Sequence, residues 1–232
     1  MLGFSFSNSV NLFLFLQLTA GLLFAIISMG LFLKLAREVF ENETVLLDTV
    51  VSQFAQGIRN PLLTTCMVFI TTLGGEIFLT LSVIVTIILI ILKKHRKDAF
   101  IFAFILLSGL GLNLLLKQTF QRARPEIMAL FVEPTYSFPS GHAMNSFIFY
   151  SCLSYFIFLK MKNRRLAGIL ICTSIVLVIL IGLSRIYLGV HYATDVLAGF
   201  AAGFFWFVII LLFEKGIKFF RLFKAYELEK KY

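Results

Sequence analysis

Apolar residues are grouped in six long segments that alternate with short polar connections. The segments cover residues 10–35, 77–92, 99–116, 143–159, 166–183 and 196–213. Because a helix needs about 20 apolar residues to cross a bilayer, each segment is typical of one membrane span. Hydrophobic residues make up 59% of the sequence and charged residues only 14%, which is outside the range of soluble domains. The pattern predicts an all-α, polytopic membrane protein, a six-transmembrane-helix bundle in which residues 1–232 form a single membrane-embedded domain.

The second apolar segment extends back to Pro61, which makes it too long for a single crossing. Gly74 and Gly75 lie within it, and small residues in succession are a common cause of a helix break. We therefore expect a short helix over residues 61–73 before the second span.

The connection between the first two spans has the pattern of an amphipathic helix. Six apolar residues recur there at helical spacing: Leu46, Leu47, Val50, Val51, Phe54 and Ile58. Asp48, Ser52 and Gln53 fall elsewhere around the helix. The segment therefore predicts an interfacial helix that lies on the membrane.

Basic residues are distributed unevenly between the two sides that six spans define. The connections at residues 93–97 and 160–165 carry four Lys or Arg each and the tail after residue 213 carries six, so fourteen of the 21 share one side. The positive-inside rule makes that side cytoplasmic. We therefore expect a plasma-membrane protein with both termini in the cytoplasm. The seven basic residues on the outer side are Lys34, Arg37, Arg59, Lys117, Arg122, Arg124 and Arg185.

The first of three polar clusters, KQTFQRARP at residues 117–125, lies where the third span ends. Lys117 and Arg124 are seven residues apart, so a continuous helix would place both cations on one face. Pro125 disfavours helix beyond that point. Taken alone, the pair is equally consistent with cations that extend from a span to the membrane interface.

The second cluster, SFPSGHAMNS at residues 137–146, precedes the fourth span. Ser140, after Pro139, is expected to cap that helix, and the backbone N–H groups at Gly141 would face an anion above the helix start. Capping alone would explain the Ser and the Gly. It does not require the imidazole of His142.

The third cluster, SRIYLGVHYATD at residues 184–195, lies between the fifth and sixth spans. His191 and Asp195 are four residues apart, so on a helix the carboxylate can accept from one imidazole nitrogen and leave the other lone pair free. That arrangement prepares a nucleophilic histidine. Arg185 supplies a planar group suited to phosphate oxygens. An interfacial histidine bonded to a nearby carboxylate would explain the pair by itself.

The six-span topology brings all three clusters to the outer side, because the fourth and fifth spans return the chain to the same face. Lys117, Arg124 and Arg185 can then balance negative charge, with backbone amides near Ser140 and Gly141. Such a set of cations, amides and histidines predicts phosphoryl transfer.

No residues are spaced as metal ligands, so the reaction is expected to proceed without a metal or other cofactor. Cys66, Cys152 and Cys172 lie singly inside apolar segments and are expected in the core. Basic residues next to spans usually record membrane orientation, so the net charge of +9 does not indicate nucleic acid as a partner. The expected partners are the bilayer and a membrane lipid, and no obligate protein partner is evident.

With these residues the sequence resembles the type 2 phosphatidic acid phosphatase superfamily, whose signatures are K-x6-RP, PSGH and SR-x5-H-x3-D. All three occur here in the family's order, within residues 117–195: Lys117, Arg124 and Pro125; Pro139, Ser140, Gly141 and His142; Ser184, Arg185, His191 and Asp195. The six-span layout is similar to that of the family's integral membrane branch.

The resemblance implies a mechanism and a set of binding residues. His191 would attack phosphorus to form a phosphohistidine that water hydrolyses, Asp195 would orient the ring, and His142 would protonate the leaving oxygen. The residues implied to bind or support the phosphate are Lys117, Arg124, Ser140, Gly141 and Arg185, with Ser184 and Pro139 in support.

The resemblance also implies a lipid phosphate or pyrophosphate as substrate, at the extracytoplasmic face. Undecaprenyl pyrophosphate, phosphatidylglycerophosphate and phosphatidate are the candidates, and no residue separates them. Glu76, about one span's length from Lys93, is expected near the mouth of the site, where it either shapes headgroup choice or lies in interfacial water or pairs with an outer-side Arg. Two alternatives stay open: a phosphotransferase with an alcohol acceptor, and a transporter of anionic lipid, which would not require the His191 and Asp195 pair.

Overall fold

The computed structural model describes residues 4–125 and 129–229, and within these ranges it contains eight helices and no strand. The helices are α1 (Phe4–Phe40), α2 (Val45–Gly57), α3 (Pro61–Thr72), α4 (Glu76–Leu92), α5 (Arg96–Phe120), α6 (Gly141–Lys160), α7 (Arg164–Tyr187) and α8 (Ala193–Glu229). The all-α fold predicted from the sequence is confirmed. The two short helices expected between the first and second spans are α2 and α3.

Among the described residues, five helices are long and apolar enough to cross a membrane, and α3 with α4, bent by 42° at the break between them, makes six if the pair counts as one span. The bend lies at residues 73–75, so the predicted break at Gly74 and Gly75 is confirmed. A Cβ atom at Gly74 would lie only 2.5 Å from Cγ2 of Ile181. The missing side chain therefore lets the break pack directly against α7.

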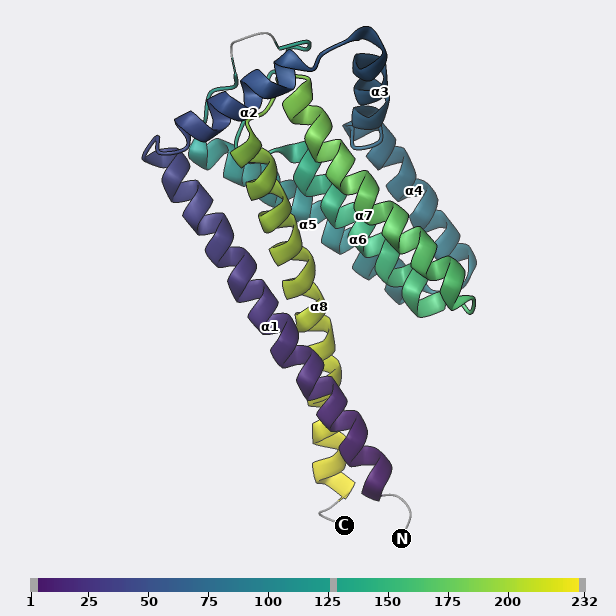
Figure 1. Ribbon diagram of the computed structural model, residues 1–232. Helices are drawn as coiled ribbons and strands as arrows, with labels where there is room; N and C mark the ends of the chain where they lie inside the picture. Colours follow the sequence, from purple (N-terminus) through teal and green to yellow (C-terminus); the bar gives the residue numbers. More distant parts are fainter. Residues whose placement is uncertain (1–3, 126–128, 230–232) are drawn as a thin grey trace.

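The helices form two connected groups in Figure 1: α4, α5, α6 and α7 make a bundle, and α1 runs beside α8. The central helix is α6, which contacts α5, α7 and α8. Fully buried side chains such as Phe102, Met144 and Ile181 fill the space between these helices. The beginning of α1 and the end of α8 lie together, while α2 crosses the opposite end of the molecule, which we call the α2 end.

The short helix α2 turns its polar side toward the protein and its apolar side outward. Asp48 is only 1% exposed, whereas Leu46 and Phe54 are 77% and 69% exposed. A helix on a soluble protein buries its apolar side, so the reversed arrangement indicates contact with lipid. The arrangement supports the predicted interfacial helix.

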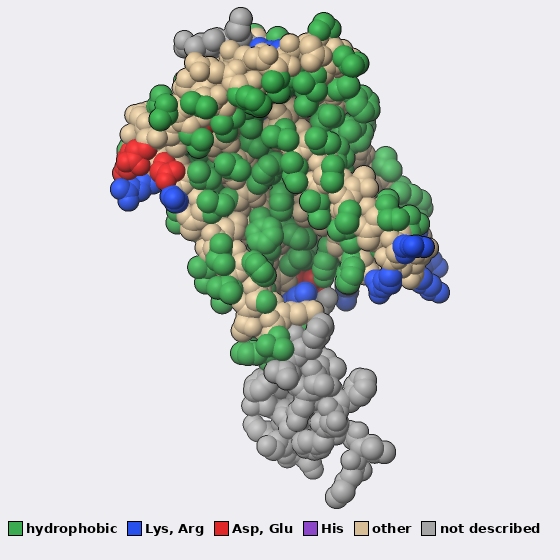
Figure 2. Space-filling view, in the orientation of Figure 1, with side chains coloured by type: hydrophobic (Ala, Val, Ile, Leu, Met, Phe, Trp, Pro, Cys, Tyr) green, Lys and Arg blue, Asp and Glu red, His purple; other side chains and the backbone are tan. Residues whose placement is uncertain are grey.

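Apolar side chains cover most of the face shown in Figure 2, and charged side chains gather at its edges. This distribution suits helices whose outer faces contact lipid along their length. It also corrects the expectation for the cysteines, because Cys152 is buried but Cys66 and Cys172 are exposed. A membrane span does not need to bury every apolar side chain in protein.

The contact between α6 and α8 depends on two glycines of α8. A Cβ atom at Gly199 would lie 2.8 Å from the carbonyl oxygen of Ser140, and one at Gly203 would lie 3.0 Å from that of Met144. Small residues of this kind let membrane helices approach backbone to backbone. The start of α8 is therefore held directly against the start of α6.

We predict that Gly199→Ala destabilises the protein by roughly 1–3 kcal/mol, because the added methyl group forces two backbones apart. Gly168→Ala in α7 is the matched control, since a Cβ atom there meets nothing within 4 Å. Thermal unfolding in detergent measures both variants. An equal or higher unfolding temperature for Gly199→Ala would contradict the close helix contact.

Candidate active site

The seven basic residues assigned to the outer side divide into two sets. Lys34 and Arg37 form ion pairs with the glutamates four residues later in the sequence, and Arg59 donates to the carbonyl of Tyr187 at the end of α7. The remaining four lie at or near the meeting point of the three polar clusters: Lys117, Arg122, Arg124 and Arg185.

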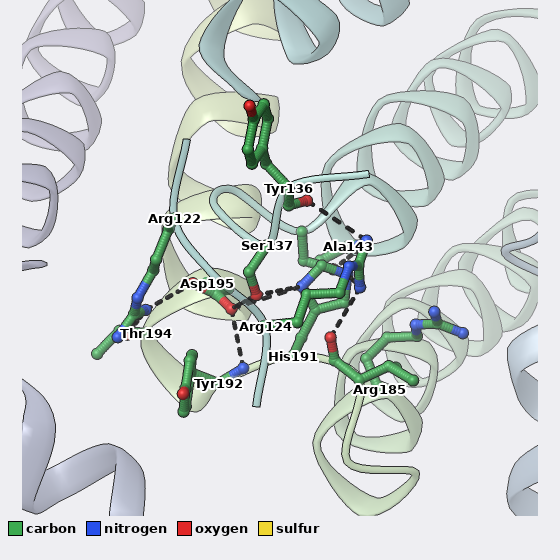
Figure 3. A network of polar contacts seen from close by, with 12 residues as sticks. Arg122, Arg124, Tyr136, Ser137, Ala143, Arg185, His191, Tyr192, Thr194 and Asp195 are labelled. Atoms are coloured by element: carbon green, nitrogen blue, oxygen red, sulfur yellow. Dashed lines mark hydrogen bonds and ion pairs between the residues drawn. The ribbon is translucent and has the colours of Figure 1, made fainter. Parts of the chain in front are cut away.

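The three polar clusters meet where α5 ends, α6 begins and α7 joins α8 (Figure 3). The backbone N–H of Ser140 donates to the carbonyl of Asp195 at 3.0 Å, which joins the second cluster to the third. Gly141 lies close to the first cluster, since a Cβ atom there would be 3.7 Å from Cε of Lys117 and 3.0 Å from Oδ1 of Asn113. The missing side chain at Gly141 thus leaves room for the Asn113 side chain of α5, and Lys117 lies within van der Waals distance of the same point.

His191 and Asp195 lie together, but not across a helix turn as their spacing predicted. Since α8 begins at Ala193, His191 precedes the helix, and Oδ2 of Asp195 accepts from the N–H of Tyr192 at 2.8 Å to hold that turn. Nδ1 of His191 lies 3.5 Å from Oδ2 of Asp195 and 3.3 Å from Oγ of Ser137. Ser137 donates to the same carboxylate oxygen at 2.5 Å. The Ser137 hydroxyl therefore bridges the imidazole and the carboxylate.

The surroundings of His191 indicate which ring nitrogen carries the lone pair. Nη1 of Arg124 lies 3.2 Å from Nε2, and a guanidinium group can only donate. Nε2 is therefore the acceptor, and Nδ1 carries the hydrogen toward Ser137 and Asp195. Burial lowers the pKa of His191 to about 4, although the Asp195 carboxylate opposes the shift. At neutral pH the ring is uncharged and Nε2 can act as a nucleophile.

Lys117 and Arg124 reach the same space without sharing a helix. The condition for a shared helix face, a helix that continues to Arg124, is not met, because α5 ends at Phe120 and Gln121 turns the chain with a left-handed φ of 45°. Nζ of Lys117 donates to the carbonyl of Tyr136, and Nη2 of Arg124 lies 3.4 Å from the same oxygen. The connection after α5 therefore brings the two cations together.

A cavity of about 520 Å³ opens beside these two cations. Its lining includes Leu114, Lys117, Arg124, Glu133 and Tyr136. Leu114 lies about one helical turn before Lys117 and is 53% exposed on the outside of a membrane span. The cavity therefore connects the apolar surface of α5 with the cations of the site.

Arg185 is buried near the end of α7 and holds two partners. Nη1 donates to Oγ1 of Thr71 at 2.7 Å, and Nη2 forms an ion pair with Glu133. The buried Nε atom has no partner among the described residues. The neighbouring Ser184 donates to the carbonyl of Ile181 at 2.6 Å, so its hydroxyl supports the helix instead of facing the cavity.

The start of α6 places His142 beside the break between α3 and α4. Ser140 caps the helix as predicted, since its side chain accepts from the N–H of Ala143 at 3.4 Å, and Pro139 before it is buried. A Cβ atom at Gly75 would lie 3.8 Å from Nε2 of His142. The imidazole therefore lies against the break between α3 and α4.

Arg122 was missed as a site residue, although it links Asp195 to α2. It donates to Oδ1 of Asp195 at 2.6 Å and to Oδ2 of Asp48 at 2.7 Å. Asp48 also accepts from the N–H and the hydroxyl of Thr194. Two sequence signals pointed to this network: Arg122 is one of the excess outer cations, and Asp48 is an acid on the polar side of an amphipathic helix.

Ser137 and Glu133 were also missed: Ser137 is the first residue of the second polar cluster but was given no role, and no pattern in the sequence marks Glu133. Both lie in the connection between α5 and α6, outside the three signatures. In the part of the chain that the structure describes, no group of three or more His, Cys, Asp or Glu side chains is placed to hold a metal ion. The positive charge of the site comes from the Lys and Arg side chains described above.

Comparison with known proteins places the chain in a family. The PAP2 superfamily profile matches residues 98–218. Phosphatidylglycerophosphatase B of Bacillus subtilis (strain 168) is 34% identical over 195 residues, which cover 82% of this chain and 94% of that protein. The chain therefore belongs to the PAP2 superfamily, and the resemblance noted in the sequence is confirmed.

Two solved structures share the fold. The transmembrane PAP2 type phosphatidylglycerolphosphate phosphatase from Bacillus subtilis has a TM-score of 0.79 at 31% identity, over 83% of this chain and 96% of that one. LpxE from Aquifex aeolicus has a TM-score of 0.58 at 25% identity, over 71% of this chain and 94% of that one. The chain is a membrane protein with the transmembrane PAP2 fold.

We predict that Arg122→Gln lowers stability by about 3 kcal/mol, because it leaves Asp48 and Asp195 buried without their cation. Adding Asp48→Asn should restore much of that stability, since it removes one of the two unbalanced charges. Phosphatase activity should stay low in the double variant, because Asp195 still lacks Arg122. Thermal unfolding and kcat are measured on the same preparations. Recovery of both quantities together would show that Arg122 has only a structural role.

Proposed function

We propose that this chain is a membrane lipid phosphatase in which His191 carries the phosphoryl group to water. The observation that carries the proposal is the position of Nε2 of His191, which lies 3.2 Å from Arg124 with Asp195 behind the ring. A nucleophile and a phosphate-binding cation are thus adjacent. The relatives named as phosphatases support the same reaction.

In the first step, Nε2 of His191 forms a bond to phosphorus while the bond from phosphorus to the lipid oxygen breaks. His142 gives its proton to that oxygen, so the lipid leaves as an alcohol. Ser137 and Asp195 hold the Nδ1–H group and balance the positive charge that develops on the ring.

In the second step, water attacks the phosphohistidine and the bond from Nε2 to phosphorus breaks. His142, now without its proton, accepts one from the water, and inorganic phosphate leaves. His191 returns to its neutral form. An alcohol in place of water would give the phosphotransferase alternative, which product analysis with added acceptor distinguishes.

Both steps require groups that hold the equatorial oxygens of the phosphoryl group. We assign this role to Lys117, Arg124 and Arg185, together with the backbone N–H of Gly141. Ser140 contributes its hydroxyl hydrogen, because its Oγ already accepts from the helix it caps. Ser184 and Pro139 support these groups through the helices that carry them.

We propose that the chain forms a single membrane-embedded domain. Its substrate is a lipid with a terminal phosphate. The cavity between Leu114 and Lys117 supports sideways approach, with the lipid chains in the bilayer and the headgroup at the cations. Phosphatidylglycerophosphate is the first candidate because of the relatives' names. Undecaprenyl pyrophosphate and phosphatidate are the others, and we include Glu76, which is exposed next to Gly75, as a contact for the headgroup. Rates of hydrolysis by the purified protein, measured for each of the three lipids, rank them as substrates.

We further propose a plasma-membrane location with both termini in the cytoplasm and the site on the outer side. The connections at residues 93–97 and 160–165 lie away from the α2 end (Figure 1). The beginning of α1 and the end of α8 also lie away from it. The fourteen basic residues of these segments support the cytoplasmic assignment. Lys230 and Lys231 of the tail lie outside the described residues.

We predict that the two histidines differ in their dependence on the leaving group. His191→Ala removes the nucleophile and should abolish hydrolysis of both lipid phosphate and nitrophenyl phosphate. His142→Ala should lower kcat about 100-fold or more on lipid phosphate, because an alkoxide needs the proton. Its effect on nitrophenyl phosphate should be much smaller, since nitrophenolate leaves without one.

His95→Ala is the control for these variants, because His95 is half-exposed in the connection between α4 and α5. Its activity on both substrates should equal that of the wild type. Equal losses on the two substrates for His142→Ala would remove the general-acid assignment. Full lipid turnover by His191→Ala would contradict the proposed reaction, and lipid transport that survives that change would favour the transporter.

The orientation is tested by labelling single cysteines in intact cells with a reagent that does not cross the membrane. In a Cys66→Ser, Cys172→Ser background, a thiol introduced by Val132→Cys at the α2 end should react at once. One introduced by Lys162→Cys, between α6 and α7, should react only after permeabilisation. The reverse pattern would place the site in the cytoplasm.

A further inference from the structure

Glu133 lies between two of the cations assigned to phosphate. Its Oε1 forms an ion pair with Nη2 of Arg185, and its Oε2 lies 3.5 Å from Nη2 of Arg124. Its side chain is 27% exposed and lines the same cavity as Lys117. A carboxylate of the protein therefore lies where phosphate oxygens are expected.

The contact with Arg185 uses only part of what that guanidinium group offers. The N–H groups of Nε and Nη2 point along one edge, at a spacing that suits two oxygens of a single anion. Glu133 contacts Nη2, and the buried Nε finds no partner in the described part of the chain. Nη1 already donates to Thr71. A phosphate has tetrahedral oxygens, so it can accept hydrogen bonds from both Nε and Nη2 of Arg185 and still present an oxygen to Arg124.

Charge explains why an acidic side chain lies there. Lys117, Arg124 and Arg185 have little exposed surface, and a cluster of buried cations without a counter-charge is costly. Burial alone would raise the pKa of Glu133, but Arg185 and Arg124 outweigh it and lower the pKa below its usual value. The carboxylate is therefore ionised at neutral pH and balances the arginines.

We propose that Glu133 is an internal competitor of phosphate. Its carboxylate occupies Arg124 and Arg185 when the site is empty and gives them up to the phosphate of the substrate. This inference rests on the proposed function, because it requires those arginines to bind phosphate. The competition weakens the binding of inorganic phosphate, so the product leaves readily and only strongly charged anions displace the carboxylate.

The test compares purified full-length wild type with Glu133→Gln, Glu133→Asp and the control Glu43→Gln. Equilibrium binding of radiolabelled inorganic phosphate is measured, together with inhibition of nitrophenyl phosphate hydrolysis by phosphate and vanadate. Glu133→Gln keeps the size of the side chain but not its charge, so phosphate and vanadate should bind at least about 10-fold more tightly.

The two other variants separate charge at this position from charge in general. Glu133→Asp keeps the charge on a side chain one methylene shorter, so its affinity for phosphate should lie between those of wild type and Glu133→Gln. Glu43→Gln removes the same charge from the exposed turn before α2 and should bind phosphate as the wild type does. Thermal unfolding confirms that each protein is folded.

Unchanged affinity in a folded Glu133→Gln protein would overturn the proposal. Weaker binding would also overturn it, because it would mean that Glu133 holds the arginines in place for phosphate. Failure of the proposed function gives a different result: phosphate binding by the wild type would then be absent or insensitive to Arg185→Gln. The two failures are therefore distinguished in one set of titrations.

Discussion

The negative charge of Asp195 lies on a side chain with no exposed surface, and the site is arranged around it. Its oxygens accept from Arg122, from Ser137 and from the N–H of Tyr192, and they lie beside Nδ1 of His191. A carboxylate without such partners would not stay ionised away from water. These donors come from the connection after α5 and from the junction of α7 and α8. The same contacts therefore join these two segments to the start of α8, which carries Asp195, and they orient the imidazole.

Charge balance extends from this carboxylate to the surface of the protein. Arg122 is shared between Asp195 and Asp48, and Asp48 belongs to a helix whose apolar side faces outward. On the other side of His191, Glu133 balances Arg124 and Arg185. Each of these arginines thus has a counter-charge before any lipid arrives. Of the three carboxylates, only Glu133 lines the cavity, because Asp48 and Asp195 are fully buried.

The sequence predicted the features that depend on local rules. A bilayer demands apolar helices of a given length, so hydropathy located the spans, and Gly74 and Ser140 marked a break and a cap that the structure contains. The structure departs from continuous helix at two helix ends: Gln121 turns the chain after α5, and His191 precedes α8, so neither pair of residues shares a helix face.

The residues that neutralise the site could not be predicted from local patterns. Arg122 pairs with Asp195 and Asp48, which are 73 and 74 residues away in the sequence, and Glu133 is 52 residues from Arg185. The signatures state which groups act on phosphate but not which charges hold those groups in place.

The proposal that His191 carries the phosphoryl group is tested by quenching turnover of a radiolabelled lipid phosphate and mapping the residue that carries the label. We expect an acid-labile, base-stable label on His191 alone, and a label on another residue, or none in an enzyme that turns over, would contradict a phosphohistidine at His191.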